Sequence, residues 1–325
     1  MLALSAIRAD ADDPLGGIEL SERPKPVAPA GWTTIAVRAA ALNHHDLWTL
    51  RGVSAGRQEF PRILGCDGAG IDENGEAVVV HTVISDPDWR GDVALDPHAS
   101  LLSERHDGTF AQWVAVPRAN LVRKPAELTF EDAACMPTAW LTAYRMLFSV
   151  SGVGPGATVL VQGAGGGVAT ALIALGRAAG MRIWTTSRSE DKRARATELG
   201  ADATFAPGER LPERVDAVME TVGAATWEHS IKSVRAGGVV VVAGMTSGDP
   251  QAMLGRIFLA KLRIVGVTMG TRDELERLLR FCVVSGVRPP IHETLPLMEA
   301  KDGFAAMASG ELFGKVVFTP PFDPS

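Results

Sequence analysis

Cysteine and tyrosine are scarce in this sequence of 325 residues. It holds three cysteines, Cys66, Cys135 and Cys282, and a single tyrosine, Tyr144. Because the cysteines are widely spaced and odd in number, they exclude a disulfide scaffold and are typical of a reducing cytoplasm. The lone tyrosine lies in TAYRML, a helix-packing context, so no obvious general acid stands out.

Long apolar runs and clusters of basic residues are also missing. No apolar stretch reaches the roughly 18 residues of a membrane span, and the initial MLALSAIRAD lacks the basic start and apolar core of a secretory signal. Basic residues are scattered in a chain of net charge −6, so nucleic acid is not an expected partner. With 46% hydrophobic residues the chain can bury a substantial core. We expect a cytoplasmic protein that binds neither membranes nor nucleic acid.

The first third of the chain predicts a compact β-rich domain. WTTIAVRAAAL, EAVVVHTVI and TFAQWVAVP have strand character, and a long polar loop covers residues 86–107. Helical signals follow, the first of them with Thr129 and Asp132 as a plausible cap. We place the boundary of this domain at residue 121, so that it comprises residues 1–121.

Strands and helices then alternate. Five apolar strands are ATVLVQG, MRIWTTS, RVDAVMETVG, GGVVVVAGM and LRIVGVTM, and helices such as GVATALIALGRAAG and SEDKRARATELG separate them. This alternation is typical of a parallel sheet covered on both faces, the doubly wound α/β architecture. We predict it for residues 122–270 and assign residues 271–325 to the first domain, because the sheet is by then complete.

The glycine-rich turn VLVQGAGGGVATA predicts dinucleotide binding. A buried strand runs into glycines and a helix starts at once, so backbone N–H groups and the helix N-terminus can approach a pyrophosphate. The usual glycine spacing is imperfect: with Gly166 in the middle, Ala164 and Ala169 stand at the outer positions. An alanine is acceptable at the first of these if the turn does not need positive φ there.

The end of the second strand of this unit favours NADPH over NADH. NAD-binding members of the fold carry an acidic residue about 20 positions after the turn, and Ser187 stands there instead. Arg188 can pair with a 2′-phosphate, and Lys192 adds positive charge one helical turn later. The alternative is that Arg188 and Lys192 are solvated charges neutralised by Glu190 and Asp191.

The order and spacing of many segments resemble the medium-chain dehydrogenase/reductase superfamily, specifically its zinc-free quinone oxidoreductase branch. The segments are LNHHDLW, FPRILGCDGAG, DGTFAQWVAVP, AACMPTAWLTAYRML, GATVLVQGAGGGVATA, VMETVG, AGMTSG, VGVTMGT and FGKVVFTP. The resemblance covers essentially the whole chain. It implies a GroES-like catalytic domain made of both chain ends, a Rossmann nucleotide-binding domain, and a homodimer in which the RIVGVTM strands join two sheets.

The row His44-His45-Asp46 suggests half of a metal site, but the resemblance argues against one. In zinc-dependent relatives the catalytic ligands fall at positions that hold Asn43, Cys66 and Thr138 here. An amide and a hydroxyl are poor zinc ligands, and the loop 86–107 lacks the cysteines of a structural zinc site. We predict no metal; the alternative is that Cys66 and a histidine improvise a site.

The resemblance also implies roles for single residues. Asn43 and Thr138 would be the catalytic residues, with Asn43 orienting the substrate or the nicotinamide ribose and Thr138 taking part in the slot vacated by zinc. The alternatives are that Asn43 orders its loop and that Thr138 is only a pocket wall. The implied cofactor contacts are Thr142, Gly166, Gly167, Val168, Val222, Gly244, Thr268 and Lys315.

Together these features predict an NADPH-dependent oxidoreductase that transfers a hydride to a quinone or an α,β-unsaturated carbonyl without zinc. Without a metal to polarise a carbonyl, conjugated acceptors remain feasible because their charge spreads over an enolate or hydroquinone. The alternatives are a zinc-type alcohol dehydrogenase with a degraded site, and a nucleotide-binding sensor or scaffold with little catalysis.

Overall fold

The computed structural model describes residues 1–53 and 59–321, which form two compact units. The first consists of Met1–Thr138, Met269–Val284 and Ile291–Ser325, and the second of Ala139–Thr268 and Ser285–Pro290. The first unit thus unites both chain ends. Its first segment extends beyond the expected boundary at residue 121, because helix α2, which lies between that boundary and Thr138, packs against strands β3 and β5 of the first unit.

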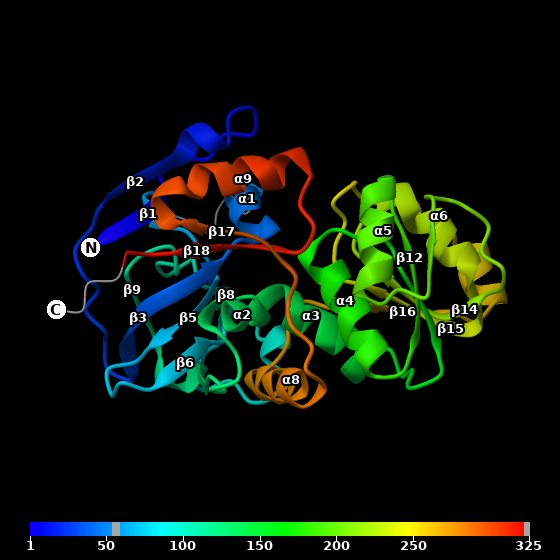
Figure 1. The fold of residues 1–325 in the computed structure, drawn as a ribbon, viewed down its shortest axis with the longest axis horizontal. Coiled ribbons are helices and arrows are strands. Elements are labelled where there is room, and N and C mark those ends of the chain that lie inside the picture. The colour runs from blue at the N-terminus through cyan, green and yellow to red at the C-terminus, as the bar shows by residue number, and fades with distance from the viewer. Residues whose placement is uncertain (54–58, 322–325) are drawn as a thin grey trace. The chain divides into compact units, whose positions relative to one another are not determined.

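The first unit is built around a seven-stranded sheet with the order β10-β6-β5-β3-β18-β17, in which β9 also pairs with β3 (Figure 1). The strands are β3 (Trp32–Ala41), β5 (Asp67–Ile71), β6 (Ala77–Val80), β9 (Trp113–Pro117), β10 (Leu121–Arg123), β17 (Ile291–Pro296) and β18 (Lys315–Thr319). Strand β18 comes from the C-terminal end of the chain and pairs antiparallel with β3, so the last strand lies beside one of the first.

Two smaller sheets complete the first unit, with the orders β2-β1-β4 and β7-β8. Their strands are β1 (Leu2–Ala6), β2 (Ile18–Glu22), β4 (Arg62–Ile63), β7 (Val83–Ile84) and β8 (Ser100–Leu101). The expected polar loop 86–107 contains β8 and a short 3₁₀ turn, Val93–Leu95, and is otherwise irregular.

Four α-helices belong to the described part of the first unit: α1 (His44–Leu50), α2 (Phe130–Ala134), α8 (Arg272–Ser285) and α9 (Ala300–Ser309). The predicted cap is confirmed, since the Thr129 hydroxyl oxygen accepts a hydrogen bond from the backbone N–H of Asp132 at 3.0 Å. The core includes the fully buried rings of Phe110, Phe304 and Phe318, with the Phe110 and Phe318 ring centres 5.0 Å apart in an edge-to-face contact.

The second unit is the predicted doubly wound domain. Its six strands are all parallel and lie in the order β13-β12-β11-β14-β15-β16, the order typical of dinucleotide-binding sheets. They are β11 (Thr158–Val161), β12 (Arg182–Thr186), β13 (Ala203–Phe205), β14 (Val215–Glu220), β15 (Val234–Val242) and β16 (Arg263–Gly266).

Helices α4, α5 and α6 pack against this sheet (Figure 1). The α-helices of the second unit are α3 (Leu141–Tyr144), α4 (Gly167–Ala178), α5 (Glu190–Leu199), α6 (Ala224–Ser233) and α7 (Leu254–Leu259). The π-helical segments Met136–Trp140 and Arg145–Val150 flank α3. Among residues 1–53 and 59–321, every helix is too short or too polar to span a lipid bilayer.

Candidate active site

A buried polar cluster forms in the first unit around the positions where zinc ligands would be expected. Asn43 precedes α1, Cys66 directly precedes β5, and Asp67 opens that strand. Thr138 lies in the π-helical segment after α2, and Lys315 opens β18. Four stretches that are distant in the sequence therefore meet. Of the residues predicted from the sequence, the structure brings together Asn43, Thr138 and Lys315, and it adds Asp67, which the sequence reasoning did not select.

Lys315 supplies the positive charge of this cluster. Its ammonium donates hydrogen bonds of 2.6 Å to the Leu42 carbonyl oxygen and of 2.6 Å to Asn43 Oδ1. It also lies 3.5 Å from Asp67 Oδ2. The Lys315 and Asp67 side chains are 3% and 0% exposed, so the pair is removed from solvent. The ammonium of Lys315, which the resemblance places among the cofactor contacts, is therefore bound to groups of the first unit itself.

Asn43 and Thr138 both donate to the same carboxylate. Asn43 Nδ2 lies 2.9 Å from Asp67 Oδ2, and the Thr138 hydroxyl lies 2.5 Å from Asp67 Oδ1. The amide nitrogen of Asn43 also faces the Ala41 carbonyl at 3.2 Å and the Cys66 sulfur at 3.5 Å. Burial raises the pKa of Asp67, and the Lys315 ammonium opposes this rise. Since its oxygen accepts from Lys315, the Asn43 amide is saturated by protein groups.

Asp46 fixes the start of helix α1, a role that the sequence reasoning missed. One of its carboxylate oxygens accepts from the backbone N–H of Asn43 at 2.9 Å, and the other from that of Gly65 at 3.0 Å. Burial raises the pKa of Asp46 to about 6. The spacing of Asn43 and Asp46, an N-cap residue with an acid three positions later, is a capping signal that could have revealed it.

A metal ion does not fit the three positions implied by the resemblance. Zinc favours thiolate, imidazole and carboxylate ligands, whereas Asn43 and Thr138 offer neutral groups that are already hydrogen-bonded. Burial raises the pKa of the Cys66 thiol well above its usual value, so the thiolate form is disfavoured. The ammonium of Lys315 lies among these side chains and would repel a divalent cation.

The structure offers one candidate, within the described residues, for a metal site built from Cys66 and a histidine. Ligand atoms of His45, Asp46 and Cys66 lie within 4.8 Å of one another, and His45 Nδ1 is buried without a hydrogen-bond partner in the described chain, which favours an ion. Both oxygens of Asp46, however, accept backbone N–H groups, and His45 Nε2 lies 3.2 Å from a Glu104 carboxylate oxygen. Asp46 and His45 Nε2 are therefore already hydrogen-bonded to other protein groups. The absence of metal stays a prediction.

The glycine-rich turn of the second unit lies between β11 and α4, and its contact with a pyrophosphate stays a prediction. After β11, Gly163 adopts a φ of +83°, whereas Ala164 is not among the residues with positive φ. The imperfect glycine spacing is thereby explained, because the position that needs glycine lies one residue earlier. Gly166 precedes α4, and a Cβ built on it meets nothing within 4 Å. With Gly167 and Val168 in the first turn of α4, the backbone N–H groups remain accessible to an anion.

The predicted NADPH-selecting residues lie together after β12. The side chain of Ser187 is half-buried and that of Arg188 is exposed. The Ser189 hydroxyl oxygen accepts from the backbone N–H of Lys192 at 3.2 Å and caps helix α5. Arg193, which the sequence reasoning did not select, donates to the Ser187 carbonyl at 2.6 Å and holds this segment against the helix.

The other predicted cofactor residues follow the carboxyl ends of neighbouring strands or lie in a helix. Val222, Gly244 and Thr268 come after β14, β15 and β16, at the edge where parallel sheets bind ligands. The buried carboxylate of Glu220 accepts the backbone N–H of Val222 at 2.8 Å and so orders this edge. Thr142 is buried in α3. Their contacts with a cofactor stay predictions.

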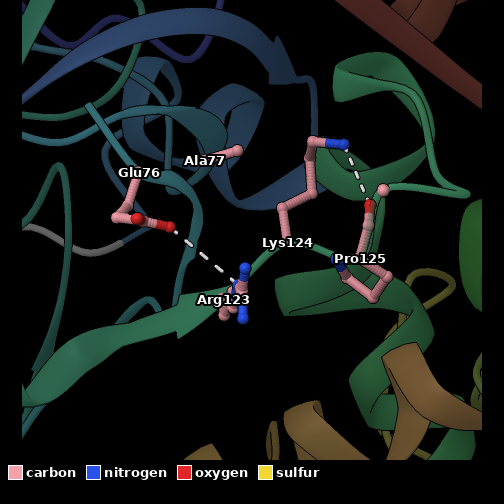
Figure 2. A pocket seen from close by; sticks show the side chains of 6 residues that line it. Glu76, Ala77, Arg123, Lys124 and Pro125 are labelled. Carbon is pink, nitrogen blue, oxygen red and sulfur yellow. Dashed lines mark hydrogen bonds and ion pairs between the residues drawn. The ribbon is translucent and has the colours of Figure 1, made fainter.

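A separate hollow of about 390 Å³ opens elsewhere in the first unit (Figure 2). Its lining residues are Glu76, Ala77, Arg123, Lys124, Pro125 and Ala126. Arg123 Nε lies 3.9 Å from a Glu76 carboxylate oxygen, and the Lys124 ammonium donates to the Pro125 and Leu128 carbonyls. None of the predicted site residues lines this hollow, so it is not the candidate active site.

Comparisons with known proteins agree with this architecture. A family model described as alcohol dehydrogenase GroES-like domain matches residues 29–126, and one described as zinc-binding dehydrogenase matches residues 167–283. The acryloyl-coenzyme A reductase of Metallosphaera sedula is 31% identical over 327 residues, covering 93% of this chain and 96% of that protein. The acryloyl-coenzyme A reductase of Sulfurisphaera tokodaii is 30% identical over 331 residues, covering 94% and 98%.

The solved structures lead to the same family. The crystal structure of an NAD-dependent alcohol dehydrogenase is 33% identical to this chain with a TM-score of 0.91, and the match covers 98% of this chain and 99% of that one. The expected fold, a GroES-like domain followed by a parallel nucleotide-binding sheet, is confirmed. The chain therefore belongs to the medium-chain dehydrogenase/reductase superfamily of oxidoreductases.

Proposed function

We propose that this oxidoreductase reduces a carbon–carbon double bond conjugated to a carbonyl, or a quinone, with NADPH and without a metal. The observation that carries the proposal is the polar cluster of the first unit, whose cation is Lys315 and whose potential ligand groups are already hydrogen-bonded. Such a slot lacks the Lewis acid that a simple aldehyde or alcohol needs. The acryloyl-coenzyme A reductases among the relatives act on a conjugated thioester by name, which favours the enoyl class.

The chemistry of a conjugated acceptor suits this slot. When bound, reduced nicotinamide supplies a hydride, which would add to the β-carbon of the acceptor. The negative charge then spreads over an enolate, so it needs less stabilisation than the localised charge of a simple alkoxide, and solvent can protonate the α-carbon. In this proposal Asn43, whose amide is hydrogen-bonded to protein groups, maintains the shape of the slot. Thr138 is half-buried and is the residue of the cluster whose side chain is partly exposed to solvent.

The acceptor class can be tested by following NADPH oxidation with a quinone, an enone, an α,β-unsaturated acyl thioester and a saturated aldehyde. We expect turnover with conjugated acceptors and none with the aldehyde, because only the former delocalise the added charge. Turnover of the aldehyde that a chelator abolishes would instead indicate a zinc-type alcohol dehydrogenase. Tight NADPH binding with no turnover of any acceptor would indicate a sensor or scaffold.

Metal independence is tested on protein purified without added metal. Elemental analysis should find well under one zinc per chain, and incubation with a chelator should leave the rate of NADPH oxidation unchanged, because Asn43 and Thr138 are engaged by protein groups. A stoichiometric zinc whose removal abolishes turnover would contradict this part of the proposal.

Selection of NADPH is proposed to depend on Arg188, whose exposed guanidinium follows Ser187 at the end of β12. A charge-assisted contact with the 2′-phosphate contributes about 1.5–3 kcal/mol, or roughly 10- to 150-fold in affinity. Arg188→Ala should therefore raise the KM for NADPH at least about tenfold and leave that for NADH nearly unchanged.

The matched control for Arg188→Ala is Arg210→Ala, which removes another exposed arginine of the second unit. It should leave both KM values unchanged. A wild-type protein that uses NADH as well as NADPH would contradict the assignment of Ser187 and Arg188.

We also propose a homodimer that joins two second units. Strand β16 is an edge of the six-stranded sheet, and an open edge is a template for pairing with another strand. Its Ile264 is 39% exposed, and Leu254, Phe258 and Leu259 of α7 are 69%, 71% and 73% exposed. A second copy would cover both features.

Sedimentation velocity can test the dimer. Ile264→Lys places a charge on the open edge and should convert the dimer to a monomer. The control Leu95→Lys places the same charge on a leucine of the first unit that is 72% exposed, and it should leave the dimer intact. A wild-type monomer, or an Ile264→Lys variant that stays dimeric, would refute the proposed interface.

A further inference from the structure

Lys315 is an unusual residue to find fully inside a β-rich domain. Transfer of an ammonium from water into a protein interior is costly unless acceptors and a counter-charge surround it. Here two oxygens, those of Leu42 and Asn43, accept from the ammonium at 2.6 Å each. The carboxylate of Asp67 lies 3.5 Å away and is itself fully buried.

We propose that the ammonium of Lys315 is the resident cation of this slot and supplies the positive charge that a metal ion supplies where metal ligands are present, without acting as a Lewis acid. It neutralises Asp67, it orients the Asn43 amide, and it prevents a divalent cation from binding. This inference rests on contacts within the first unit and is independent of the reductase activity proposed above.

The charge balance supports this assignment. Asp67 is the carboxylate paired with the ammonium, and the remaining donors around it, the Asn43 amide and the Thr138 hydroxyl, are neutral. Lysine and aspartate together have no net charge, and a divalent ion placed among these groups would lie close to an ammonium. Asp46, a further carboxylate near Cys66, already accepts two backbone N–H groups. The Cys66 sulfur lies 3.5 Å from both the Asn43 nitrogen and the Thr138 oxygen and so borders the same slot.

The geometry also shows why the cation is held in place. Lys315 belongs to β18, which pairs with β3, and the carbonyl of Leu42 that it contacts lies directly after β3. The backbone N–H of Leu42 donates to the Val316 carbonyl at 2.9 Å. A sheet register that is fixed by backbone hydrogen bonds therefore sets the position of the ammonium, as a set of ligands sets the position of a metal.

The inference predicts that removal of the ammonium creates a cation site. In Lys315→Met the buried Asp67 carboxylate keeps its bonds from Asn43 and Thr138 but loses its counter-charge, so a divalent cation can take the place of the ammonium beside Oδ2, with Cys66 as a second ligand. We test this with Co²⁺ added to the full-length protein and measure bound cobalt by elemental analysis and thiolate coordination by the charge-transfer absorption. The wild type and Lys315→Arg should take up almost no cobalt, and Lys315→Met should take up about one ion per chain with a thiolate band.

The matched control is Lys124→Met, which removes another lysine of the first unit whose ammonium donates to backbone carbonyls. It should bind no more cobalt than the wild type. Stoichiometric cobalt with a thiolate band in the wild type would overturn the inference, and so would a folded Lys315→Met that binds none.

A second measurement covers the case in which Lys315→Met does not fold. If the pair Lys315–Asp67 is the internal charge balance, the double variant Lys315→Met/Asp67→Asn removes both charges and should show a cooperative urea transition, either at a higher urea concentration than Lys315→Met or where that single variant shows no transition. A double variant no more stable than the single one would show that the pair is not coupled. Neither readout involves NADPH oxidation, so the reductase proposal can fail or succeed separately.

Discussion

A charge that is buried on folding must be neutralised where it lies, and this requirement shapes the first unit. The ammonium of Lys315 is placed by the last strand of the chain, its counter-charge Asp67 by β5, and the acceptors Leu42 and Asn43 by the turn between β3 and α1. Loss of one partner of such a buried pair typically costs about 3–5 kcal/mol. The two chain ends are therefore held together by electrostatics as well as by the pairing of β18 with β3.

The second unit depends on a different constraint, the backbone conformation at strand ends. Gly163 takes up positive φ directly after β11, which L side chains rarely adopt, and the helix α4 can then begin at the edge of the sheet. At β14 the carboxylate of Glu220 accepts from backbone N–H groups of Val222 and Gly223 and from the hydroxyls of Thr226 and Ser230. These bonds satisfy a fully buried carboxylate and order the edge at which a dinucleotide is expected.

These constraints agree with the proposed chemistry. A reductase of conjugated double bonds depends less on a Lewis acid than an alcohol dehydrogenase does, since the charge formed on the acceptor is delocalised. An internal ion pair gives the slot of the first unit rigidity without net charge. In the proposed function, the exposed Arg188 after β12 discriminates between NADPH and NADH because only NADPH carries a 2′-phosphate on its adenosine ribose.

Local sequence patterns determined much of the architecture. The alternation of apolar strands and helices predicted the parallel sheet, Thr129 and Asp132 predicted a cap, and the turn GAGGG predicted where the nucleotide edge lies, since each signal arises from residues close together in the chain. The pairing of Lys315 with Asp67 could not be read in this way. The two residues are far apart in the sequence, and a lysine in a strand reads equally well as a surface charge or a phosphate contact. Only the tertiary structure, through the register of β18 against β3, decided that this ammonium is buried beside Asn43, because burial and counter-charge are properties of neighbours in space.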